Sequence, residues 1–171
     1  MAENTMLYNE VSTVDTQKDK YLTFQLAGEF YAIEIKYVTE IVGMQDITEV
    51  PDLAKYIKGV INLRGKVIPV INVRLRFLIK EREYDSRTCI IIIHIGPTVV
   101  GLIVDEVSEV INIPEEHIDS PPKTMKGTKS RFIKGFGKVA NKVKMILDID
   151  KFLNDQEIDE IKSIESVSNV Q

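Results

Sequence analysis

Few side chains in this sequence could carry out chemistry, and each has a simpler structural interpretation. His94 lies in the apolar strand CIIIIHI, which favours a core or partly exposed histidine over a catalytic base. His117 lies in PEEHIDSPP, where the neighbouring acids indicate a solvated surface group. Cys89 stands among isoleucines, as a buried inert thiol would. Asp148 and Asp150, two residues apart in LDID, fit the exit from a strand into a helix.

The motifs of metal, nucleotide and thiol chemistry are missing from the sequence. It contains no HExxH, CxxC, GxGxxG or P-loop pattern, and the GFG at 135–137 is only a pair of glycines. The sequence therefore predicts a protein that is not an enzyme and needs no cofactor or metal.

The length and composition of the chain are those of one soluble globular domain or of two small domains that share a core. The chain has 171 residues, of which 44% are hydrophobic and 28% charged. Its apolar runs, such as residues 89–93, have the length of strands and are too short to span a bilayer. The first twenty residues lack the pattern of a secretory signal, and a single cysteine excludes an intramolecular disulfide. We expect a cytoplasmic protein.

Charge is distributed unevenly. Residues 123–144 carry eight basic and no acidic side chains, whereas residues 148–165 are mainly acidic. The simpler interpretation is two solvated faces of opposite sign; the alternative is a patch that binds an acidic partner or nucleic acid. The net charge of −4 and the sparse aromatic residues of the stretch, Phe132 and Phe136, argue against nucleic acid.

Local patterns predict short strands with few helices. We expect a mobile tail over residues 1–19, and the period of two in YLTFQLA starts a strand at Tyr21. Short helical turns are predicted over residues 35–41 and 52–58, with a helix near residues 73–77. Asn154 and Glu157 form a capping-box pattern for a C-terminal helix over residues 154–171, with Ile158, Ile161 and Ile164 on one side.

The second half of the chain repeats the first. CIIIIHIG aligns with YLTFQLAG at an offset of 68, VGLIVDEVSEVI with YAIEIKYVTEIV at 69, and IKGFGKVANKVKMILDI with IKGVINLRGKVIPVINV at 76. Each half then holds four or five strands, enough for a small barrel or a strongly curled sheet, and neither half can bury its apolar strands alone. Two similar barrels packed on each other are predicted.

The repeat also separates residues that the fold requires from residues that it does not. Gly59 aligns with Gly135 and Val67 with Val143, so these positions serve the fold in both halves. Arg64 aligns with Ala140, so an equivalent hairpin closes without an arginine. The interpretation is that Arg64 contacts a partner, although a plain solvated turn residue is the alternative.

Three segments resemble the CheW family, the coupling proteins of bacterial chemotaxis: VTEIVG at 38–43, IKGVINLRGKVIPVINV at 57–73 and VGLIVDEVSEV at 100–110. The resemblance covers residues 20–153. It implies an all-β fold of two SH3-like five-stranded barrels on a shared core, roughly residues 31–88 and 98–145 with strands exchanged, together with short helices and a C-terminal helix. It also implies a non-enzymatic adaptor, cytoplasmic and associated with membrane receptor arrays, that couples chemoreceptor tips to the histidine kinase CheA.

Two sets of site residues follow from this resemblance. The groove that receives the helical receptor tip corresponds to Ile35, Val38, Glu40, Ile41, Arg64, Val107 and Val110. The kinase contacts correspond to Gly59, Val60, Asn62 and Leu63 in one barrel and to Asp119, Lys123 and Thr124 in the other. The alternatives are a coupling protein of a non-flagellar chemosensory pathway, a small-barrel nucleic-acid-binding module, and a small hydrolase built on His94.

Overall fold

The computed structural model describes residues 17–127 and 129–170, with side chains described as far as Ile164. The predicted tail at 1–19 therefore lies almost entirely outside the described residues. In the first half, the strands are β1 (Lys20–Leu26), β2 (Glu29–Glu34), β3 (Val38–Gly43), β4 (Ile57–Leu63) and β5 (Lys66–Asn72), followed by α2 (Val73–Arg76). A single 3-10 turn, η1 (Ile35–Tyr37), joins β2 to β3.

The second half runs through the same order of elements. Its strands are β6 (Cys89–Ile95), β7 (Thr98–Val104), β8 (Glu106–Asn112), β9 (Ile118–Asp119), β10 (Ile133–Val139) and β11 (Lys142–Leu147). The 3-10 turns η2 (Glu115–His117) and η3 (Lys129–Phe132) precede β9 and β10, and α3 (Ile149–Phe152) and α4 (Asp155–Val170) end the chain.

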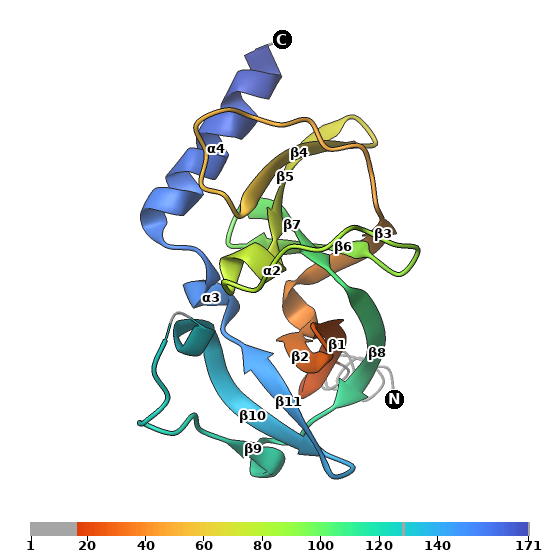
Figure 1. The fold of residues 1–171 in the computed structure, drawn as a ribbon, viewed down its shortest axis with the longest axis vertical. Helices are drawn as coiled ribbons and strands as arrows, with labels where there is room; N and C mark the ends of the chain where they lie inside the picture. The colour runs from red at the N-terminus through yellow and green to blue at the C-terminus, as the bar shows by residue number, and fades with distance from the viewer. Residues whose placement is uncertain (1–16, 128, 171) are drawn as a thin grey trace, which may run out of the picture.

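The strands form two sheets that lie one above the other, with α2 and α3 near their junction (Figure 1). One sheet has six strands in the order β8-β1-β2-β11-β10-β9, and the other has five in the order β3-β6-β7-β5-β4. The predicted mainly-β fold is confirmed. The smaller sheet has the five strands expected for each barrel, and the larger sheet has a sixth because Ile118–Asp119 pairs with β10 as β9.

The two halves of the chain exchange strands. β1 pairs with β8 of the second half, and β6 pairs with β3 of the first half. The hairpin β4–β5 joins the five-stranded sheet through a parallel pairing of β5 with β7, and the hairpin β10–β11 joins the six-stranded sheet through a parallel pairing of β11 with β2. Each sheet therefore combines the first two strands of one half with the third strand and the hairpin of the other half.

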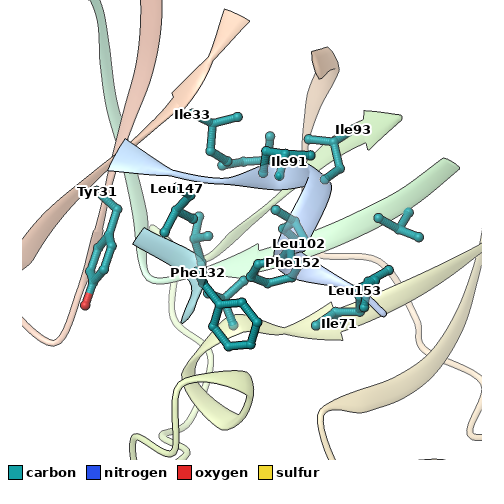
Figure 2. Close-up of a cluster of buried hydrophobic side chains, with 14 of the residues drawn as sticks. Tyr31, Ile33, Ile71, Ile91, Ile93, Leu102, Phe132, Leu147, Phe152 and Leu153 are labelled. Carbon is teal, nitrogen blue, oxygen red and sulfur yellow. The ribbon is translucent and has the colours of Figure 1, made fainter. Parts of the chain in front are cut away.

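Side chains from both sheets share the main hydrophobic core (Figure 2). Tyr31 and Ile33 enter it from β2, and Ile91 and Ile93 enter it from β6. Phe152 in α3 belongs to the same core, where its ring packs against those of Phe77 and Phe132, and it is fully buried. Each aliphatic or aromatic side chain buried in this way contributes about 1.5–3 kcal/mol, so the two sheets stabilise each other.

The short helices are equivalent elements at the offset of 76. Asn72 caps α2 by accepting a hydrogen bond from the Leu75 amide at 3.2 Å, and Asp148 caps α3 by accepting one from the Lys151 amide at 3.3 Å. The helix predicted near residues 73–77 is confirmed.

Of the two predicted helical turns, the first is shorter than expected and the second is wrong. The turn predicted over residues 35–41 is present as the single 3-10 turn η1, and it ends at Tyr37 because β3 begins at Val38 and pairs with β6. Residues 52–58 form no helix, because β4 begins at Ile57 and pairs with β5, and because the Tyr56 carbonyl accepts a hydrogen bond from the Asn72 amide at 2.7 Å.

The capping box that starts α4 is confirmed and is tied to the core. The Glu157 amide donates to Asn154 Oδ1 at 2.8 Å, and the Asn154 amide donates to Glu157 Oε1 at 3.4 Å. Glu157 is buried, and its carboxylate also accepts hydrogen bonds from the Tyr56 hydroxyl and from Arg76 Nη2. Ile161 is fully buried one turn further along α4.

Arg76 is the central cation of this region. Its guanidinium donates to the Phe152 carbonyl at 2.8 and 3.2 Å, and it lies 4.4 Å from the ring centroid of Tyr56 and 4.6 Å from that of Phe132. Burial lowers the pKa of Arg76 to about 10 and raises that of Glu157. Arg76 nevertheless remains charged at neutral pH, since 10 lies well above 7.

Gly59 holds an edge of the five-stranded sheet against the preceding loop. Its φ is +143°, and a Cβ at this position would overlap the carbonyl of Thr48. Thr48 and Val60 exchange two backbone hydrogen bonds of 2.9 Å beside it. Glycine is required here because the two backbones approach so closely.

We predict that Arg76→Met lowers the free energy of unfolding by about 3–5 kcal/mol, since it leaves the buried Glu157 carboxylate without its cation. Chemical denaturation measures the loss. Arg131→Met is the matched control, because Arg131 also lies over the Phe132 ring, at 5.3 Å, but is exposed. Equal stability of the two variants would contradict the assigned role of Arg76.

We predict that Gly59→Ala lowers the free energy of unfolding by about 1–3 kcal/mol, through backbone strain and displacement of Thr48. Gly43→Ala provides the comparison, because Gly43 has no positive φ and no heavy atom within 4 Å of an added Cβ. Thermal denaturation of both variants checks the prediction, and a Gly59→Ala protein as stable as the parent would refute it.

Candidate functional site

Arg64 forms an ion pair at the tip of the β4–β5 hairpin. Its Nη2 lies 2.7 Å from Glu40 Oε1 and 2.6 Å from Glu40 Oε2, although the Arg64 side chain is 70% exposed. Arg64 and Gly65 both have positive φ, 51° and 85°, as the two central residues of a type I′ turn do. The Gly65 amide donates to Asn62 Oδ1 at 2.9 Å and closes the turn.

The equivalent hairpin of the second half closes without an arginine. Ala140 and Asn141 stand in place of Arg64 and Gly65, with φ of 49° and 64°. Positive φ is unfavourable for an arginine, as it is for other residues with a Cβ, so the turn itself gives no reason for Arg64. Its structural partner is Glu40 on β3.

A groove of about 570 Å³ lies beside this ion pair. Ile68, Ile92 and Val99 contribute apolar surface from β5, β6 and β7, and the Arg64–Glu40 pair lies on the rim. Leu63 and Val67 extend the apolar lining along the hairpin. The sequence prediction missed Ile68, Ile92 and Val99, because they lie in strands that look uniformly buried from sequence.

The remaining residues predicted for a receptor groove lie in or before the edge strands β3 and β8. Ile41 on β3 and Val110 on β8 are 44% and 52% exposed, which is unusual for large aliphatic side chains. Ile35, Val38 and Val107 are half-buried and pack against the main core. Figure 1 shows β3 and β8 on the side of the molecule opposite to α4. None of these five residues lines the 570 Å³ groove.

The residues predicted to contact a kinase do not come together. Gly59, Val60, Asn62 and Leu63 lie in β4, the edge strand of the five-stranded sheet. Asp119 lies in β9, the edge strand of the six-stranded sheet, and the exposed Lys123 and Thr124 follow it. Figure 1 places β4 and β9 at opposite ends of the molecule, so these residues form two separate surfaces.

The candidate catalytic residues occupy structural positions. His94 is exposed, with Nε2 3.0 Å from the Lys36 carbonyl oxygen and the ring 6.4 Å from that of Tyr37. Burial raises the pKa of the Cys89 thiol, which disfavours the thiolate. Within residues 17–127 and 129–170, no group of three His, Cys, Asp or Glu side chains could hold a metal ion.

The basic stretch at 123–144 is partly neutralised by acids from elsewhere in the chain. Lys129 pairs with Glu29, Lys134 with Glu34 and Lys138 with Asp119, at 2.9, 3.0 and 2.6 Å. This pairing favours the interpretation of a solvated face over that of a nucleic-acid site. In the part of the chain that the structure describes, no helix has the length and apolarity needed to cross a membrane.

Comparison with known proteins gives a consistent result. The family model of the CheW-like domain matches residues 20–157. "Chemotaxis protein CheW" of Bacillus subtilis is 38% identical over 136 residues, covering 80% of this chain and 87% of the relative. The CheW protein of Klebsiella aerogenes is 33% identical over 144 residues, covering 84% of this chain and 87% of the relative.

One solved structure is similar to this chain in both fold and sequence. The crystal structure of the scaffolding protein TtCheW from Thermoanaerobacter tengcongensis superposes with a TM-score of 0.74 at 37% identity, covering 81% of this chain and 94% of that one. The exchange of strands between the two sheets, the matching motifs and these relatives all agree. The chain belongs to the CheW family of chemotaxis scaffold proteins.

Proposed function

We propose that the protein is a non-enzymatic adaptor that couples the cytoplasmic tips of chemoreceptors to the histidine kinase CheA. Membership of the CheW family supports this role, and the absence of catalytic motifs from the sequence is consistent with it. The adaptor would act in the cytoplasm, held at membrane receptor arrays through its partners. Coupling then requires simultaneous binding, without any reaction on this chain.

The single observation that carries the receptor site is the Arg64–Glu40 ion pair beside exposed apolar surface. A receptor tip is a helical hairpin, and a helix binds in an apolar groove through anchors three or four residues apart. Ile41 and Val110 offer exposed contacts on the edge strands, and Val38 and Val107 lie half-buried in the same strands. Arg64 and Glu40 supply rim charges that would set the register of the bound helix.

The kinase contacts fall on two surfaces under this proposal. The outer edge of β4, with Val60 half-buried and Asn62 exposed, presents one surface, and the residues from Asp119 to Thr124 present the other. Because they lie at opposite ends of the molecule, each could contact a different kinase subunit or a different part of one kinase. This arrangement suits a scaffold that extends an assembly in two directions.

Arg64→Glu is predicted to weaken binding to a receptor tip by about 1 kcal/mol or more, about fivefold, because it removes a rim cation and repels Glu40. The melting temperature should change little, since an exposed ion pair contributes about 0–1 kcal/mol. Calorimetric titration with a receptor-tip fragment measures the affinity. Ala140→Glu is the matched control, because it introduces the same charge at the equivalent turn and should leave receptor binding intact.

A large loss of stability in Arg64→Glu with unchanged receptor affinity would contradict the assignment. The double variant Glu40→Arg/Arg64→Glu adds a second check, because it restores the ion pair with reversed polarity. If the rim charges set the register, this variant should be as stable as the parent and still bind the receptor tip poorly.

Val60→Glu is predicted to reduce capture of CheA by at least about fivefold, the scale of a contributing interface residue, while receptor affinity stays unchanged. The side chain lies on the outer face of β4, so the new charge meets a partner without entering the core. Pull-down with the CheA regulatory domain measures capture, and a melting curve excludes unfolding. Undiminished capture would remove the β4 edge from the kinase site. Gly59→Asp is unsuitable for this purpose, because Gly59 is required for contact with Thr48.

A further inference from the structure

The second half of the molecule has a groove of about 400 Å³ beside the β10–β11 hairpin. Its apolar lining consists of Phe30, Phe136, Val143 and Met145, and Val143 is 53% exposed. At the offset of 76, Val143 is the equivalent of Val67, which lines the groove beside Arg64. The two grooves are therefore related by the internal repeat, and we call this second one the hairpin groove.

The hairpin groove lies where two strands of the six-stranded sheet separate. β11 pairs with β10 along residues 142–147, but its parallel pairing with β2 covers only Met145 with Tyr31 and Ile146 with Ala32. Residues 142–144 of β11 therefore have one strand neighbour rather than two. A strand with an unpaired side can pair with an extended segment of another chain through main-chain hydrogen bonds.

The side chains of this unpaired segment alternate in chemistry. Successive side chains of a strand point to opposite faces, so Lys142 and Lys144 lie on one face and Val143 on the other. The Lys144 ammonium lies 3.6 Å from the centroid of the Phe30 ring, and the Lys142 ammonium lies 5.5 Å from the same centroid. Both cations thus lie against one ring, whereas the face of Val143 continues through Met145, which packs against the main core.

Neither of these lysines forms an ion pair with any side chain that the structure describes. The acid in the groove, Glu29, is already paired with Lys129 at 2.9 Å. Lys144 is only 8% exposed; desolvation lowers its pKa, and the opposing effect of Glu109, which lies beyond ion-pair distance, is smaller. Since a nearly buried cation without a counter-ion is unfavourable, its presence beside the groove indicates an anionic ligand.

A second copy of this chain fits the groove poorly. If the unpaired segments of two β11 strands met, lysines would lie opposite lysines, and like charges directly opposite are destabilising. The start of α4 is acidic, with Asp155 and Asp159 exposed, but Ile158 and Ile161 of the same helix pack against the main core. The α4 surface therefore has the charge but lacks the apolar side chains that the groove would receive. The observations favour a different protein as the ligand.

We propose that the hairpin groove binds an extended acidic segment of another protein, which adds as a strand beside residues 142–144 of β11. Carboxylates at two alternate positions face Lys142 and Lys144, and the apolar residue between them faces Val143. The pattern recognised is acidic, apolar, acidic, because side chains directly opposite on paired strands lie on the same face. Main-chain hydrogen bonds supply affinity, and the charges supply specificity. This site is independent of the proposed receptor and kinase contacts.

The test titrates the isotope-labelled full chain with the capped peptide TEVEVET and follows the amide NMR signals. Binding predicts that the signals of residues 142–145 and of Phe30 shift, while those of the equivalent residues 66–68 in the first half do not. Two control peptides should bind at least about fivefold more weakly: TKVKVKT, which has the opposite charge, and TEEEVVT, which has the same composition without the alternation.

A charge reversal on the protein gives a second readout. Lys142→Glu should weaken binding of TEVEVET at least about fivefold and strengthen binding of TKVKVKT, because residue 142 is exposed and the new carboxylate would face the peptide lysines. Lys66→Glu, at the equivalent position of the first half, is the matched control and should alter neither affinity. If Lys142→Glu does not fold, the comparison of the three peptides on the parent chain decides the question.

Four results would overturn the proposal. The first is the absence of shifts at residues 142–145 at millimolar TEVEVET. The second is equal binding of TEVEVET and TEEEVVT, which would mean that charge alone, without an added strand, attracts the peptide. The third is an equal loss of affinity in Lys142→Glu and Lys66→Glu. The fourth is oligothymidylate that binds at residues 142–145 as tightly as TEVEVET, which would assign the lysines to nucleic-acid phosphates.

Discussion

The exchange of strands between the two halves is the constraint on which the rest of the structure depends. β1 lies beside β8 and β3 beside β6, so neither half contains a complete sheet by itself. The Thr23 hydroxyl, which donates to the Glu109 carbonyl at 2.7 Å, reinforces one of these pairings across 86 residues of sequence. Because the paired strands are contributed by both halves, separating the halves would break both sheets. The edge strands β3 and β8 are thereby held on one side of the molecule, where a partner could meet both.

The region around Arg76 shows how the exchanged halves are joined. Tyr56 and Phe132 are equivalent at the offset of 76, and the Arg76 guanidinium lies over both rings. Phe152, whose carbonyl accepts two hydrogen bonds from Arg76, is itself the equivalent of Arg76. The two equivalent rings thus surround a contact that is not symmetric, because α2 contributes the Arg76 cation and α3 contributes the Phe152 carbonyl. Glu157 adds the C-terminal helix to this cluster, so α4 is fixed to the same point at which the halves meet.

Asymmetry between repeats also marks the surfaces that are free to bind. Arg64 and Ala140 close turns of the same shape, and Ile68 and Lys144 occupy equivalent strand positions. Arg64 is exposed and is neutralised by Glu40, whereas the Lys144 residue is 8% exposed and its ammonium lies 3.6 Å from the centroid of the Phe30 ring. Duplication supplies the common fold, and the departures from it give the two halves chemically different surfaces. A scaffold needs such distinct sites, because a symmetric molecule would present the same surface twice.

Local sequence patterns alone determined most of the strands, the capping box at Asn154 and Glu157, and the repeat. They also showed that the hairpin turn does not require Arg64. These features depend on residues close together in the chain or on direct comparison of two segments. Only the tertiary structure decided that residues 52–58 form no helix, that Gly59 contacts Thr48, that Glu40 is the partner of Arg64, and that the β4 edge and Asp119 lie at opposite ends. Each of these depends on pairing between distant segments, whose hydrogen bonds and packing override local preference and leave no periodic signal in the sequence.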